Sequence, residues 1–63
     1  MKSLCDALHR YIGRECCVTV VEDEEICGTL RECGDNWILL TDEDNTDFII
    51  NTNKIIYVYM EEE

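Results

Sequence analysis

Basic residues are scarce in this chain, and their scarcity limits what it can bind. The 63 residues include 5 Lys and Arg against 15 Asp and Glu, for a formal net charge of −10. A protein that neutralises phosphates needs clustered cations. Here the cations are scattered one at a time: Lys2, Arg10, Arg14, Arg31 and Lys54. The composition disfavours nonspecific binding to nucleic acid or to an anionic membrane, whereas a basic protein partner fits the charge.

Long apolar runs and catalytic patterns are also absent from the sequence. No apolar run approaches 18 residues, so no membrane-spanning segment is predicted. The N-terminus lacks the apolar core of a signal peptide, and we expect a cytoplasmic protein whose five cysteines stay as thiols. The three glycines are isolated, which argues against a phosphate-binding loop. The single histidine, His9, has no partner for nucleophilic catalysis, so we predict no catalytic residue and no enzyme.

The cysteines lack the paired spacing that is typical of structural zinc sites. Cys16 and Cys17 are adjacent on an expected strand and therefore point to opposite faces. If Val20 faces Ile26 across the next hairpin, Cys17 and Cys27 are diagonal neighbours about 7–8 Å apart. That separation is too large for an unstrained disulfide. We therefore predict that the cysteines act as small apolar residues, with no metal and no cofactor.

Acidic residues gather in three runs where turns or the chain end are expected: Glu22–Glu25, Asp42–Asp44 and Glu61–Glu63. These runs are typical of solvated loops. Divalent-cation binding is the alternative, although none of the runs has the alternating carboxylates around a central Gly of a calcium loop.

The apolar patterning predicts one helix and five strands. Ser3 and Asp6 have the spacing of a capping box, and Gly13 marks the helix end. We predict a helix over about 3–12 and strands over about 15–21, 26–33, 37–41, 47–50 and 54–60. The fold class is an all-β small barrel of strongly bent antiparallel strands, forming one domain over 1–63. Gly28 is predicted to mark a sharp bend or bulge that helps the barrel to close.

The last two predicted strands are apolar on both faces. In the final strand, strict alternation places Ile56 and Val58 on one face and Tyr57 and Tyr59 on the other. A half-solvated strand would alternate apolar with polar residues. We therefore expect that the N-terminal helix or another subunit covers the outer face.

This succession of elements resembles the Sm-like (LSm) family of small barrels over essentially the whole chain. The residues that carry the resemblance are Val18-x-Val20, Gly28-Thr29-Leu30, the Trp37–Leu40 strand, Asp42, Ile50, Ile55 and Val58. A related group of bacterial small barrels, which includes spore-coat proteins, is similar to the same extent. The resemblance implies a non-enzymatic homo-oligomer, a ring that acts as a scaffold or interaction module. In that family the fourth strand of one subunit pairs with the fifth of the next. The interface predicted here is Phe48, Ile49, Ile50, Ile55, Ile56, Tyr57, Val58 and Tyr59.

The alternative function implied by the resemblance is single-stranded RNA binding. Family members that bind RNA use an Asp and an Asn around an aromatic residue or Met, and a turn, commonly Arg-Gly, before the last strand. These positions fall here on Gly34 or Asp35, Ile38, Asn51 and Thr52, so the pattern is not retained. The residues left as candidate base contacts are Asn36, Trp37, Asn51, Asn53 and Lys54. Trp37 has two interpretations, a core residue that starts a strand or a stacking platform for a base.

Overall fold

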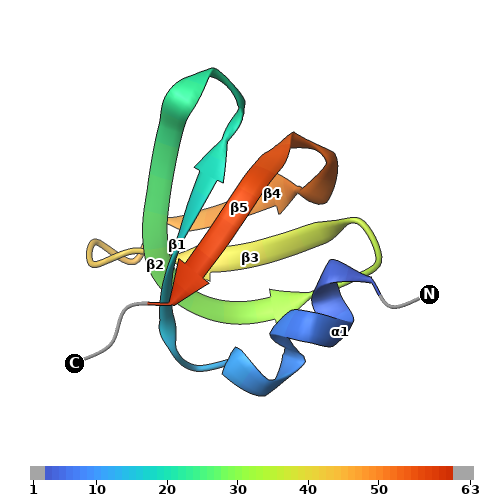
Figure 1. Cartoon of the computed structure of the whole chain (residues 1–63). Helices are drawn as coiled ribbons and strands as arrows, with labels where there is room; N and C mark the ends of the chain where they lie inside the picture. The colour runs from blue at the N-terminus through green and yellow to red at the C-terminus, as the bar shows by residue number, and fades with distance from the viewer. Residues whose placement is uncertain (1–2, 61–63) are drawn as a thin grey trace.

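The structure is a computed structural model that describes residues 3–60, in which one short helix precedes five antiparallel strands of a single sheet (Figure 1). The strands are β1 (Glu15–Val20), β2 (Glu24–Cys33), β3 (Trp37–Thr41), β4 (Asp47–Asn51) and β5 (Ile55–Met60). Their order in the sheet is β4-β3-β2-β1-β5. The predicted β-rich fold with one N-terminal helix is confirmed. The sheet is open over these residues, with β4 and β5 as its edges, so closure into a barrel is not part of the observed fold.

The helix begins where its capping residues predict. In α1 (Leu4–Leu8), the Asp6 amide donates to Ser3 Oγ at 3.3 Å and the Ser3 amide donates to Asp6 Oδ2 at 3.1 Å. This reciprocal pair satisfies two of the N–H groups that a helix start leaves without partners. The helix ends earlier than predicted, because a 3-10 turn over His9–Tyr11 tightens the chain. Gly13 then adopts φ 94° and donates its N–H to the Leu30 carbonyl at 2.8 Å.

The core lies on the concave face of the sheet, and α1 packs against it. Its buried residues come from the helix and four strands: Leu8, Cys16, Val18, Val20, Leu30, Ile38, Leu40 and Ile50. Figure 1 shows α1 beside the end of β2. The helix therefore covers the core and leaves the outer face of β5 exposed. Among the described residues, no helix is long and apolar enough to cross a membrane.

Strand β2 curves strongly and belongs to both halves of the sheet (Figure 1). Thr29 lies opposite Glu15 of β1 on one side and opposite Thr41 of β3 on the other. Beside it, a Cβ on Gly28 would lie 2.7 Å from the Thr41 carbonyl oxygen. Gly28 therefore permits the backbones of β2 and β3 to approach each other closely at the bend. The predicted bulge is not at this residue, because the register shift between β2 and β3 falls after Leu30.

A second register shift changes which residues of β5 face the core. Tyr57 lies opposite Thr19, but Val20 lies opposite Ile55, so Ile56 is the extra residue of a bulge. The predicted strict alternation is therefore wrong at the start of the strand. Ile55 packs against the core from the same side as Val58 and Met60, and the residues left exposed are Ile56, Tyr57 and Tyr59.

Two disulfides correct the prediction that the cysteines remain thiols. One joins Cys5 of α1 to Cys33 at the end of β2, with Cα atoms 5.5 Å apart. The other joins Cys17 to Cys27, which lie directly opposite each other with Cα atoms 4.0 Å apart. Cys16 remains a thiol and is buried.

The predicted hairpin register was wrong because the β1–β2 turn is tighter than assumed. Glu22 and Asp23 both adopt positive φ, 71° and 62°, so the chain reverses within Val21–Asp23. Val20 consequently pairs with Glu24. Each earlier residue of β1 then pairs with a β2 residue two positions closer to the turn than predicted. This shift brings the two cysteines face to face.

Candidate functional site

The predicted base-contacting residues meet at one end of the sheet. Trp37, which starts β3, lies directly opposite Asn51, which ends β4. The Thr52 amide donates to the Asn36 carbonyl at 3.0 Å, which ties the turn before β3 to the turn before β5. The Asn53 amide donates to Asn51 Oδ1 at 2.9 Å. Asn36, Trp37, Asn51 and Asn53 thus lie near one another at this end of the sheet, and the exposed Lys54 follows Asn53 in the chain.

Trp37 is neither a core residue nor a fully exposed stacking platform. It is half-buried and lies outside the core cluster. The Gly34 amide donates to the Trp37 carbonyl at 2.8 Å, and a Cβ on Gly34 would collide with the indole ring. The ring therefore lies over Gly34 at the strand start, with part of its surface open to solvent. Such a ring offers a partial stacking surface.

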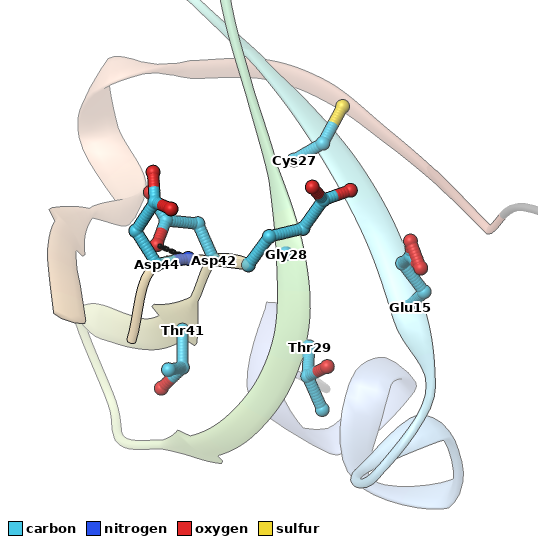
Figure 2. Close-up of a pocket in the computed structure, with 8 residues that line it drawn as sticks. Glu15, Cys27, Gly28, Thr29, Thr41, Asp42 and Asp44 are labelled. Carbon is cyan, nitrogen blue, oxygen red and sulfur yellow. Dashed lines mark hydrogen bonds between the residues drawn. The ribbon is translucent and has the colours of Figure 1, made fainter. Parts of the chain in front are cut away.

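An acidic pocket of about 300 Å³ lies between the middle of β2 and the β3–β4 loop (Figure 2). It is lined by Glu15, Cys27, Gly28, Thr29, Thr41, Asp42, Glu43 and Asp44. Asp42 Oδ1 accepts hydrogen bonds from the amides of Asp44 and Thr46, both at 2.9 Å. An aspartate that accepts from amides two and four residues ahead organises its own loop. Asp42 therefore has a structural role in the β3–β4 loop.

The predicted assembly interface divides into an inner and an outer set. Phe48, Ile50, Ile55 and Val58 pack on the core side of their strands. The exposed residues are Ile49 at 74%, Ile56 at 57%, Tyr57 at 54% and Tyr59 at 40%. The outer surface of both edge strands therefore carries large apolar side chains.

A group of residues that sequence reasoning missed lies on the outer face of β1, β2 and β5. Cys17 is flanked by Cys27 on β2 and by Tyr59 on β5. The Tyr59 hydroxyl donates to Glu25 Oε2 at 3.0 Å. One signal could have revealed the pairing, because Cys17 and Cys27 are equally distant in sequence from Glu22, the centre of the turn. A symmetric hairpin about Glu22 places them opposite each other.

Cys16 fits the prediction that the cysteines act as small apolar residues. Its side chain is fully buried on the core face, opposite to that of Cys17. Burial raises the pKa of the Cys16 thiol above its usual value, and the charge of Glu15 raises it further. A thiol with a raised pKa is a poor nucleophile at neutral pH.

No protein-family model matches the chain, and no curated protein is significantly similar to it in sequence. A functional assignment therefore depends on the geometry of the edges, the turns and the outer face.

Proposed function

We propose that this chain is a non-enzymatic, Sm-like barrel subunit that assembles with copies of itself into a ring. In this assembly the β4 edge of one copy pairs with the β5 edge of the next, which continues the sheet across subunits. The observation that carries the proposal is the order β4-β3-β2-β1-β5, which leaves these two strands as the ends of the sheet. They have five and six residues, so their lengths differ by one residue.

The side chains of the two edges complement each other on both faces of the proposed joint. On the inner face, Phe48 of β4 and Met60 of β5 are only partly buried at the margins of the core. Pairing would bring these margins together and remove further apolar surface from water. On the outer face, Ile49 would lie beside Tyr57 and Tyr59 of the neighbouring copy. Aromatic and β-branched pairs of this kind stabilise sheets.

The edges carry little of the protection that natural proteins give to strands that stay unpaired. Such strands usually contain charged residues, Lys above all, or Pro. In β4 and β5 together, Asp47 is the one charged residue, and neither strand contains Pro. The bulge at Ile56 twists only the start of β5. An apolar edge of this length is an aggregation hazard unless a partner covers it.

Light scattering coupled to size-exclusion chromatography tests the proposal. We expect an oligomer at micromolar concentration, with a melting temperature that rises with protein concentration because association stabilises the folded chain. Ile49→Lys should dissociate it by placing an ammonium in the joint. Val21→Lys is the matched control, since Val21 is also β-branched and exposed (44%) but lies in the β1–β2 turn. A native chain that is monomeric at this concentration would contradict the proposal.

RNA binding is a second candidate, which the meeting of Trp37, Asn36 and Asn51 at one end of the sheet supports. Bases would stack on the exposed part of the indole and accept hydrogen bonds from the amides. The net charge of −10 opposes it, because the field repels phosphates. Fluorescence anisotropy with short U-rich and A-rich RNAs at low salt tests the idea. Binding that disappears in Trp37→Ala would support it, and no binding would exclude it.

Two further predictions from the sequence stay predictions, namely a basic protein partner and a cytoplasmic location. The disulfides bear on the second, because structural disulfides are typical of oxidising compartments and cytosolic ones are usually transient or redox-sensing.

A further inference from the structure

The outer face of the sheet brings two cysteines and a carboxylate together around one point. One potential ligand atom from each of Cys17, Glu25 and Cys27 lies within 4.8 Å of the other two. Glu25 and Cys27 are two residues apart on β2, so their side chains point to the same face, and Cys17 reaches it from β1. Cys27 and Glu25 are exposed, while Cys17 is buried beneath them.

We propose that reduction of the Cys17–Cys27 disulfide converts this group into a binding site for a thiophilic divalent cation of the Zn²⁺ class. The two thiolates and one oxygen of Glu25 would be the protein ligands, and water would occupy the fourth position. Three protein ligands and an open position are a common arrangement for zinc. The proposal is independent of self-assembly, because all three ligands belong to one chain.

The distance between Glu25 and Cys27 already suits such an ion. Glu25 Oε1 lies 3.6 Å from Cys27 Sγ. An ion bound tetrahedrally to a carboxylate oxygen at about 2.0 Å and a thiolate at about 2.3 Å separates these two ligand atoms by about 3.5 Å. The carboxylate therefore needs little movement relative to Cys27 Sγ. The two sulfur atoms must separate to about 3.8 Å for the same geometry, a change that cysteine side-chain rotation can supply on strands already paired.

Tyr59 holds the carboxylate in the orientation that the site requires. Its hydroxyl donates to Glu25 Oε2, so Oε1 is the oxygen that faces Cys27. A hydrogen bond to the second oxygen of a ligating carboxylate orients the ligand and tunes its basicity. Tyr59 would thus be a positioning residue for the ion.

The conversion requires two electrons, which a dithiol reductant supplies. One thiolate of the reductant attacks the exposed Cys27 Sγ, the S–S bond breaks, and Cys17 leaves as a thiolate. The second thiol of the reductant then displaces Cys27, closing the reductant to its own disulfide. The reductant's two protons pass to the cysteine sulfurs, and both are released to solvent when the cation binds. Oxidation of the site would expel the ion, so the site is redox-gated.

Cobalt(II) titration reports on the proposed site directly, because thiolate ligation to this ion gives a charge-transfer band in the near ultraviolet. The whole chain is reduced with dithiothreitol, desalted without oxygen and titrated. We expect one ion per chain with the thiolate band, and no band from the oxidised chain. Zn²⁺ should displace the cobalt and remove the band. Absence of a stoichiometric band from the reduced chain would overturn the proposal.

Variants locate the ion and separate this site from the other thiols. The Cys5→Ala/Cys33→Ala double variant and Cys16→Ala should both retain the band, whereas Cys27→Ser should lose it. Loss of the band in the first two, with retention in Cys27→Ser, would place the ion elsewhere and refute the assignment.

Two milder substitutions test the oxygen ligand and its positioning residue without removing a cysteine. Glu25→Gln changes an exposed side chain and should weaken binding more than any other substitution outside the cysteines. Tyr59→Phe should weaken it roughly tenfold, as removal of an outer hydrogen bond usually does. Tyr57→Phe is the matched control, since Tyr57 is an exposed neighbour with its ring centroid 6.2 Å from that of Tyr59. Equal affinities for Tyr59→Phe and Tyr57→Phe would contradict the role of Tyr59, and an unchanged Glu25→Gln would remove Glu25 from the site.

Discussion

Cys5 of α1 is bonded to Cys33 at the far end of β2, across 28 residues of sequence. The helix is otherwise attached to the sheet by few buried side chains, of which Leu8 is the one fully within the core. The disulfide therefore fixes the helix over the core. In a chain of 63 residues, whose core is small, such a crosslink can supply much of the net stability.

Removal of this disulfide should destabilise the folded chain substantially. Closing a loop of this length restricts the unfolded chain by about 3–4 kcal/mol in the chain-entropy description. We expect the Cys5→Ala/Cys33→Ala variant to lose about that much unfolding free energy in urea at fixed protein concentration. The single variant Cys16→Ala, which breaks no crosslink, is the control for loss of a cysteine side chain. A loss for the double variant no larger than for Cys16→Ala would show that the helix is held by packing alone.

The β1–β2 turn should tolerate, and benefit from, residues that favour positive φ. Glu22 and Asp23 both occupy the left-handed region, which costs most side chains roughly 1 kcal/mol and Asp less than most. Asp23→Gly should therefore raise the unfolding free energy by about 0.5–1 kcal/mol, measured by thermal denaturation. The control is Glu24→Gly, which removes the same charge at φ −87° and should destabilise. Stabilisation by both would point to charge relief and not to backbone geometry.

Gly28 and Gly34 should respond differently to alanine. At Gly28 the new Cβ would lie 2.7 Å from a backbone oxygen of Thr41, which cannot move without opening the bend of β2. Gly28→Ala should cost about 1–3 kcal/mol of unfolding free energy. At Gly34 the obstacle is the side chain of Trp37, which can rotate away.

Gly34→Ala should therefore alter the position of Trp37 more than the stability. Trp37 is the single tryptophan of the chain, so intrinsic fluorescence reports on it alone. We expect a shift of the emission maximum toward longer wavelength as the indole loses its cover, with a smaller loss of stability than for Gly28→Ala. An unchanged spectrum would mean that the ring does not lie over Gly34 in solution.

The pH dependence of the unfolding free energy in alkaline solution should depend on Cys16. Burial raises the pKa of this thiol in the folded chain, whereas the unfolded chain titrates near the usual value of about 8.5. As pH rises above that value, the unfolded chain loses the proton and the folded chain keeps it, so the unfolding free energy falls. Below about pH 8.5 the Cys16 thiol is protonated in both the folded and the unfolded chain, so it adds no pH dependence to the unfolding free energy. Cys16→Ala should show a shallower decline between pH 8 and 10, and an identical decline would assign the effect to other groups.

The parts of the fold that the sequence predicted are those that local signals determine. The capping box of Ser3 and Asp6, which starts the helix where predicted, depends on neighbours within a few residues. The core faces of β1 and β2 followed from strict alternation, and Cys16, Val18 and Leu30 are all buried as that pattern implies.

The predictions of strand pairing failed where the conformation of one residue sets the pairing register of a whole strand. The conformation of Glu22 sets the pairing of the whole β1–β2 hairpin. A glutamate gives no sign of positive φ, although Asp23 beside it is a residue type that tolerates it. The bulge at Ile56 likewise reverses the faces at the start of β5. Both features depend on tertiary fit, so the disulfide at Cys17 and the exposed outer face could not be derived from periodicity.

The two edge strands of the sheet, β4 and β5, present different surfaces, and this determines which symmetries the proposed assembly can have. A joint between β4 and β5 is heterologous: each copy offers one kind of edge and accepts the other. Two copies satisfy both edges only if the joint relates them by a rotation of 180°. It closes into a cyclic group if the rotation per copy divides a full turn, and otherwise extends as a helical filament. The angle between β4 and β5, set by the curvature of β2 between them, is therefore the quantity that selects the number of subunits.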